Sequence, residues 1–132
     1  MTASDQGSAQ EAALRAYAER ITAHDADGVL ALFAEGDDVF VEDPVGAPRV
    51  QGRAAVERFY RRAAGEAAPE ITVTGPIRTT MGRGAALPMR VRYTYKGRRF
   101  EADVVDIMRF DDAGKIVSME AYWHPARARP VD

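Results

Sequence analysis

Residues 99–110 read RFEADVVDIMRF, and this stretch decides the fold because its side chains alternate between two faces. One face is apolar apart from a single acid, and consists of Phe100, Ala102, Val104, Asp106, Met108 and Phe110. The other face is mixed, and consists of Glu101, Asp103, Val105, Ile107 and Arg109. The alternation predicts a long strand with one carboxyl group in the middle of its apolar face.

Asp106 is the unusual member of this strand. A lone carboxyl group among apolar neighbours is costly to ionise, so we expect its pKa to rise and the side chain to stay protonated. A neutral acid is a hydrogen-bond donor at pH 7, and titratable groups perturbed in this way are typical of functional sites. The interpretation requires an unbroken strand between Ala102 and Met108, because a bulge would reverse the two faces.

The segments before this strand are mostly helical. Apolar residues at helical spacing predict a first helix around Leu14, Tyr17 and Ile21. Asp25 is a candidate N-cap for a second helix over 26–35. A short strand over 37–44 ends at Pro44, and a third helix follows, with an apolar stripe made by Val56, Phe59, Tyr60 and Ala63.

From Glu70 onward the pattern is that of strands. Runs over 70–81, 87–95, 98–110 and 115–123 are separated by turns at Lys96-Gly97 and at 111–114. Helices followed by long strands predict an α+β fold, with a curved antiparallel or mixed sheet wrapped around three N-terminal helices as a cone. We expect one domain over 1–132, with frayed ends at 1–9 and 125–132.

A cone of this kind has one open, apolar mouth, and strand parity predicts its lining. Besides the 100–110 strand, the inward set is Val39, Val41, Asp43, Leu87, Met89, Val91, Tyr93, Val117, Met119, Ala121 and Trp123. We expect Val41, Leu87, Met89, Val104, Met119 and Trp123 to contact the ligand. This lining suits a flat apolar ligand better than a sugar or a nucleotide.

Asp43 is the second inward carboxyl group. At the end of its strand and next to Pro44, it should be less desolvated than Asp106, with a pKa nearer normal, and so available as a base. Two carboxyl groups whose surroundings separate their pKa values suggest acid and base roles. The alternative is that Asp43 only caps the turn before Pro44.

Tyr17 and Tyr60 lie on the apolar stripes of the first and third helices. Buried tyrosine hydroxyls require hydrogen-bond partners, and each tyrosine alone could be a core residue bonded to a backbone carbonyl. Both are directed at the cavity that holds Asp106, with Asp43 nearby. The four together favour a catalytic site.

Composition excludes several functions. The 132-residue chain has no cysteine and two histidines, which rules out thiol chemistry and a histidine-based metal centre. A net charge of −2 argues against nucleic-acid or anionic-membrane partners. No apolar stretch is long enough to span a bilayer or to act as a signal peptide, so we expect a soluble, cytoplasmic protein.

Four blocks resemble the bacterial Δ5-3-ketosteroid isomerases, which have the cone-shaped fold of the nuclear transport factor 2-like superfamily. The blocks are RAYAERITAHDADGVLALFAE, VEDPVG, GRAAVERFYRR and DVVDIMRFDDAGKIVSMEAYW. The resemblance covers residues 10–124 and keeps the order of the motifs. A neutral carboxylic acid is a known feature of these isomerases, so the role of Asp106 comes from the resemblance, whereas its raised pKa follows from the strand pattern.

The resemblance implies an isomerase that moves the C5=C6 double bond of an apolar steroid to C4=C5, without metal or cofactor. Asp43 matches the general base, Tyr17 and Asp106 match the two donors to the C3 oxygen, and Tyr60 matches the tyrosine that supports Tyr17. Trp123 matches a pocket position near the base. Phe33 departs from the pattern, because some members have a further network tyrosine there.

Two other functions use the same cone: a non-catalytic receptor for apolar ligands, and a cyclase or epoxide hydrolase acting on a polyketide or terpene. Epoxide opening would require an Asp/Arg/Asp set, and Arg109 faces away from Asp106. A homodimer is also implied, and apolar residues on the outward sheet face agree with it. Those residues are Val105, Ile107 and Ile116, set among charged neighbours such as Glu120.

Overall fold

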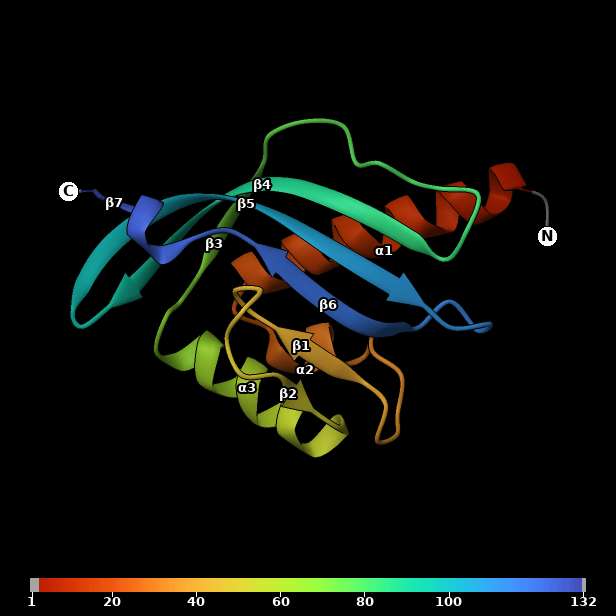
Figure 1. The fold of residues 1–132 in the computed structure, drawn as a ribbon, viewed down its shortest axis with the longest axis horizontal. Coiled ribbons are helices and arrows are strands. Elements are labelled where there is room, and N and C mark those ends of the chain that lie inside the picture. Colours follow the sequence, from red (N-terminus) through yellow and green to blue (C-terminus); the bar gives the residue numbers. More distant parts are fainter. Residues whose placement is uncertain (1–2, 132) are drawn as a thin grey trace.

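The long strand expected at 99–110 is β5, Arg98–Phe110, in the middle of a curved, mixed sheet (Figure 1). The structure, a computed structural model, describes residues 3–131. The strand order is β2-β1-β6-β5-β4-β3, with β7 also paired to β5. The strands are β1 (Phe40–Glu42), β2 (Val50–Gln51), β3 (Glu70–Val73), β4 (Gly84–Tyr95), β6 (Ile116–Tyr122) and β7 (Arg129–Pro130).

Three helices cover the concave face of this sheet. They are α1 (Ala3–Thr22), α2 (Ala26–Leu30) and α3 (Arg53–Gly65), and a short 3-10 helix, η1, spans Pro125–Arg127. Figure 1 shows α1 crossing behind β4, β5 and β6, with α2 and α3 on the side of β1 and β2. The α+β cone predicted from the sequence is confirmed. No helix in residues 3–131 is long and apolar enough to cross a membrane.

β5 keeps its alternation. Its inward side chains are buried from Ala102 to Phe110, whereas Asp103, Val105 and Arg109 are exposed. Its pairing with β4 is in register from Arg98 to Arg109, and its pairing with β6 is unbroken from Val105 to Arg109. No bulge therefore interrupts the stretch around Asp106.

A register shift lies beyond it and makes one expectation wrong. Arg109 pairs with Ser118 but Phe110 pairs with Ile116, so Val117 is an extra residue in β6. This bulge turns Ile116 inward, where it is fully buried, instead of outward as predicted. The outward apolar patch is therefore smaller than expected, and its exposed members include Val105 and its strand partner Tyr122. The homodimer stays a prediction.

The second helix is shorter than predicted, and ends at Leu30 rather than at residue 35. Asp25 does cap it, since its carboxylate accepts a hydrogen bond from the Gly28 N–H at 2.9 Å. The chain then joins the sheet. The Ile116 N–H donates to the Leu32 carbonyl and the Ala34 N–H donates to the Ile116 carbonyl, both at 2.9 Å. These bonds replace those of a continuing helix.

The chain ends expected to be frayed are built into the fold where the structure describes them. In α1, the side-chain amides of Gln6 and Gln10 donate to the Gly82 carbonyl, at 2.7 and 2.8 Å. At the other end, β7 pairs with Phe100 and Glu101 of β5. Both contacts are long-range side-chain or strand pairings that the local sequence pattern does not reveal.

Candidate active site

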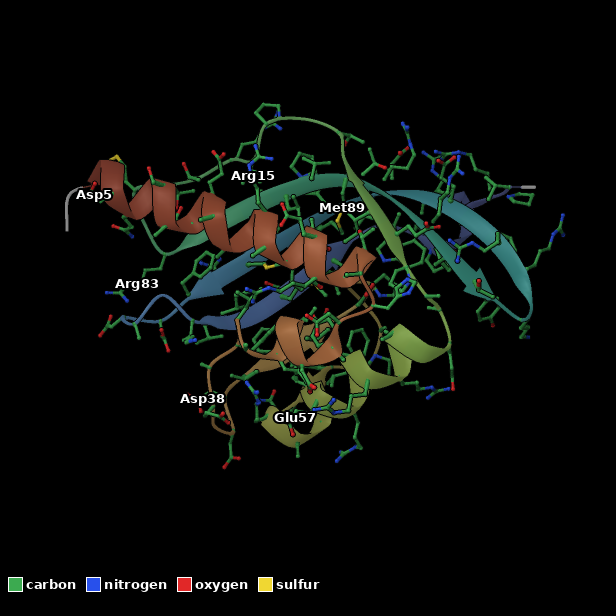
Figure 2. All side chains as sticks on the ribbon, turned by 180° about the vertical axis from the view of Figure 1, so that it is seen from behind. Asp5, Arg15, Asp38, Glu57, Arg83 and Met89 are labelled. Carbon is green, nitrogen blue, oxygen red and sulfur yellow. The ribbon has the colours of Figure 1, made fainter. Side chains whose placement is uncertain are left out.

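The cone encloses a cavity of about 270 Å³ between α1, α3 and the inner face of the sheet. Figure 2 shows Met89 on β4, on the side of the sheet that faces the helices. The lining is apolar apart from two carboxyl groups and three tyrosines. It consists of Tyr17, Ile21, Asp43, Phe59, Tyr60, Ala63, Ala67, Pro69, Ile71, Met89, Val91, Tyr93, Ala102, Val104, Asp106, Met119 and Trp123.

Four of the six expected ligand contacts line this cavity: Met89, Val104, Met119 and Trp123. Val41 and Leu87 do not line it, and both are fully buried in the core. They lie on the predicted face, and their direct strand partners, Met119 for Val41 and Asp106 for Leu87, do line the cavity. Strand parity predicts which face of the sheet a side chain lies on, but not whether that side chain borders the cavity or packs in the core.

The sequence interpretation missed part of the lining. Ile21, Phe59 and Ala63 had been placed on apolar helix stripes but not in the cavity, and Ala67 and Pro69 had no assignment. For the three helical residues the sequence did contain a signal, the apolar stripe of each helix, because one stripe can face both the core and the cavity. The segment between α3 and β3 has no periodicity that could have placed Ala67 and Pro69.

Tyr17 and Tyr60 meet deep in the cavity. Their hydroxyl oxygens are 2.9 Å apart and hydrogen-bonded, and both side chains are only 3% exposed. Burial is the main reason that the pKa of each hydroxyl lies well above its usual value, so both are neutral donors. The negative charge of an ionised Asp106 or Asp43 would raise both pKa values further, because the four groups are close together.

Asp106 is 1% exposed, and its Oδ1 atom has no hydrogen-bond partner among the described residues. Burial raises its pKa well above the ordinary range, and the neighbouring charge of Asp43 raises it further. This direction agrees with the expectation from the strand pattern. A buried polar atom without a partner is costly, and in a residue that lines a cavity it is a sign of a functional site.

Asp43 lies at the end of β1 and is held by Trp123, whose indole N–H donates to Asp43 Oδ1 at 2.7 Å. Burial raises the pKa of Asp43, and this hydrogen bond opposes the shift because it stabilises the carboxylate. Asp43 is therefore more desolvated than a rim position implies, but it is less buried than Asp106 and its pKa is raised less, which agrees with the expectation. The turn that follows is bound by its neighbour, since Glu42 Oε2 accepts from the Gly46 N–H at 3.0 Å.

Phe33 lies where a further hydroxyl would extend the tyrosine pair. Its ring centroid is 5.3 Å from that of Tyr60, and it is 3% exposed. A phenyl ring supplies packing and no donor, so the hydrogen-bonded network ends at Tyr60 on this side. Within residues 3–131, no three His, Asp or Glu side chains are grouped as metal ligands.

The raised pKa of Asp106 predicts a pH-dependent stability. In the unfolded chain a carboxyl group ionises near pH ~4. Above that pH the folded state binds one proton more than the unfolded state, so the stabilising contribution of Asp106, full below pH ~4, is lost as pH rises through its folded pKa. We therefore expect the free energy of unfolding of the wild type, relative to that of Asp106→Asn, to decline as pH rises. Denaturant unfolding of both proteins at several pH values measures this difference. A constant difference would contradict the raised pKa.

Comparisons with known proteins identify the family and the fold. The SnoaL-like domain family matches residues 14–119. A steroid Delta-isomerase from Nocardioides simplex is 36% identical over 115 residues, which are 87% of this chain and 89% of that protein. The solved structure of SalBIII superposes with a TM-score of 0.83 and 22% identity, covering 92% of this chain and 95% of that one.

SalBIII is described as an epoxide hydrolase/cyclase-like enzyme in pyran ring formation in the polyether salinomycin, and at this identity its likeness shows the shared fold. The isomerase match is closer in sequence and extends over most of both chains. The chain therefore belongs to the SnoaL-like domain family, as an isomerase-like member of the nuclear transport factor 2-like superfamily related to the ketosteroid isomerases.

Proposed function

We propose that this protein is a Δ5-3-ketosteroid isomerase that moves the C5=C6 double bond of its substrate to C4=C5. The observation that carries the proposal is the placing of a neutral buried acid, Asp106, and a neutral phenol, Tyr17, in one apolar cavity with a second carboxyl group, Asp43. Neutral donors opposite a base are what proton abstraction next to a ketone requires.

In the first step, an Asp43 carboxylate oxygen takes a proton from C4. The electrons of the broken C4–H bond form a C3=C4 double bond, and the carbonyl π electrons move to the C3 oxygen, giving a dienolate. The hydroxyls of Tyr17 and Asp106 donate hydrogen bonds to that oxygen. Because both donors are fixed in a water-poor site, they stabilise the new charge without reorganising.

In the second step, Asp43 returns the proton to C6. The C5=C6 electrons form the new C–H bond, the C3=C4 electrons move to C4=C5, and the C3 carbonyl forms again. One carboxyl group serves both carbons, so no proton has to be exchanged with solvent. The apolar walls, among them Met89 and Val104, hold the rings against Asp43 and make the transfer an oriented step within the complex.

The direct test is the absorbance of the conjugated enone formed from a Δ5-3-ketosteroid. Conversion by the wild type supports the isomerase. Binding of the steroid without conversion would favour a receptor, and absence of both would favour a cyclase with another substrate. Epoxide opening of the Asp/Arg/Asp type is disfavoured, because the residues lining the cavity include no arginine and Arg109 is exposed on the opposite face.

Trp123→Phe should move the pH profile of this reaction. The base must be ionised, so kcat/KM falls as pH drops through the pKa of Asp43. The variant loses the indole N–H that stabilises the carboxylate, so the pKa of Asp43 rises and the acidic limb moves to higher pH. The ring is kept as an aromatic wall, and the measurement is kcat/KM across pH. An unmoved limb would mean that Trp123 does not act on the base.

A further inference from the structure

The third helix is strongly basic, although the whole chain has a net charge of −2. Within Arg53–Gly65 the charged residues are Arg53, Glu57, Arg58, Arg61 and Arg62, four cations and one acid. Such a concentration beside an apolar cavity creates a local positive field that the overall composition conceals.

The cavity lies next to a groove on this helix. An open groove of about 860 Å³ runs along α3 and β2, and it shares Phe59, Ala63 and Ala67 with the cavity lining. These three residues are half-buried, whereas Tyr17 and Asp106 at the inner end are buried. A ligand whose oxygen lies between the two inner donors can therefore extend outward past these three residues, toward α3.

The arginines lie next to Phe59 and Ala63 because of helix geometry. Phe59 and Ala63 are four residues apart and form one row on the helix, and Arg58 and Arg62 form the neighbouring row. Both arginines line the groove. A group leaving the cavity over Phe59 and Ala63 consequently meets two guanidinium groups.

The arginines of α3 differ in how firmly they are held. Arg53 is held by Glu57 at 3.2 Å and by the Phe33 and Ala34 carbonyls, and Arg61 pairs with Asp27 at 2.9 Å. Arg62 pairs at 3.0 Å with Glu66, which also lines the groove; this pair and the Arg61–Asp27 pair are both exposed, and such pairs are weak. Arg58 has no ion-pair or hydrogen-bond partner in the part of the chain that the structure describes.

We propose that the groove binds an anionic group at the end of the substrate's side chain, so that the substrate class is a Δ5-3-ketosteroid carrying a carboxylate-terminated chain at C17. This inference rests on the proposed function. The 270 Å³ cavity takes the rings, and the chain passes Ala63 and Ala67 to reach Arg58 and Arg62. A guanidinium group binds a carboxylate through two parallel hydrogen bonds.

The test compares a Δ5-3-ketosteroid that has such a carboxylate with its methyl ester, which is equally long and neutral. At low salt the wild type should have about a tenfold higher kcat/KM for the acid, and the preference should shrink as salt rises. The double variant Arg58→Gln/Arg62→Gln should lose the preference through KM, with kcat and the ester reaction unchanged, because the contact is remote from the reacting atoms.

The control variant is Arg15→Gln, which removes one paired surface arginine, whereas the double variant removes two arginines. Arg15 forms the same kind of pair, with Glu11 one turn earlier on α1 at 3.0 Å, and Figure 2 shows it far from Glu57 on α3. It should keep the preference for the acid. Equal kcat/KM for acid and ester in the wild type would contradict carboxylate binding in the groove, without contradicting the isomerase activity. So would loss of the preference in Arg15→Gln as well as in the double variant.

If neither substrate is isomerised, the proposed function is wrong. Carboxylate binding in the groove is then tested by measuring the affinities of the acid and the ester. Trp123, the single tryptophan of the chain, lines the cavity and reports occupancy by its fluorescence. A lower dissociation constant for the acid than for the ester, lost in the double variant, would support the groove. Equal constants would overturn it as well.

Discussion

Asp43→Asn should lower kcat by about 1,000-fold, within the range of roughly 100- to 10,000-fold that a general base contributes. The amide cannot accept the C4 proton at neutral pH, so the dienolate does not form. Its shape is that of the carboxyl group, and its side-chain oxygen can still accept the Trp123 indole N–H. Steroid affinity should therefore change little, because the walls that bury the rings are untouched. Enone absorbance and Trp123 fluorescence measure the two quantities separately.

The control for this variant is Asp103→Asn, which makes the same change of charge on the outer face of β5. Asp103 is exposed and its nearest cations, Arg90 and Arg129, are 3.5 Å away. We expect wild-type turnover. If Asp43→Asn weakened binding as much as turnover, Asp43 would be a ligand contact and not the base. If it retained turnover, the proton would be taken by another group.

Asp106→Leu should reduce turnover by roughly 100- to 1,000-fold, the usual effect of removing one donor from an oxyanion site. Folding should not suffer. Leucine has the same branching as aspartate, and it replaces a buried carboxyl group whose Oδ1 has no partner. Removing an unsatisfied buried polar atom abolishes a desolvation penalty, so the melting temperature should stay the same or rise. Kinetics and thermal unfolding together give the answer.

Asp106→Asn separates the donor from the charge. The amide keeps one N–H for the C3 oxygen and cannot ionise, so its loss of turnover should be smaller than that of the leucine variant. If both variants unfolded, the carboxyl group would be needed for structure, through contacts that the 1% exposed side chain makes in the core. If Asp106→Leu had the turnover of the wild type, Asp106 would take no part in the reaction.

The features that could be predicted from the sequence are those that follow from the spacing of apolar residues within one strand or one helix. The inward face of β5 and the direction of Asp43 follow from parity, and the tyrosines follow from the helical stripes. The sequence did not predict what depends on pairing between distant strands. The bulge at Val117 that reverses Ile116 arises where β5 and β6 curve together, and the early end of α2 arises because Leu32 and Ala34 bond to Ile116.

The sequence also did not predict which of the inward side chains border the cavity. Leu87 and Met89 are two residues apart on the same face of β4, yet only Met89 lines the cavity. Which inward side chains border the cavity depends on how helices and strands pack together, and single-strand patterns contain no information about that. The same reason explains why Asp43 is more desolvated than a rim residue, since Trp123 returns over it from the far end of the chain.

The parallel pairing of β1 with β6 determines when a newly made chain can first become active. Asp43 and Trp123 are 80 residues apart, and they meet only after Val41 has aligned with Met119. Closing such a long loop is slow in comparison with forming helices or hairpins. A chain emerging from the ribosome can therefore assemble its tyrosine pair early, but its two carboxyl groups act together only after the last long strand has docked.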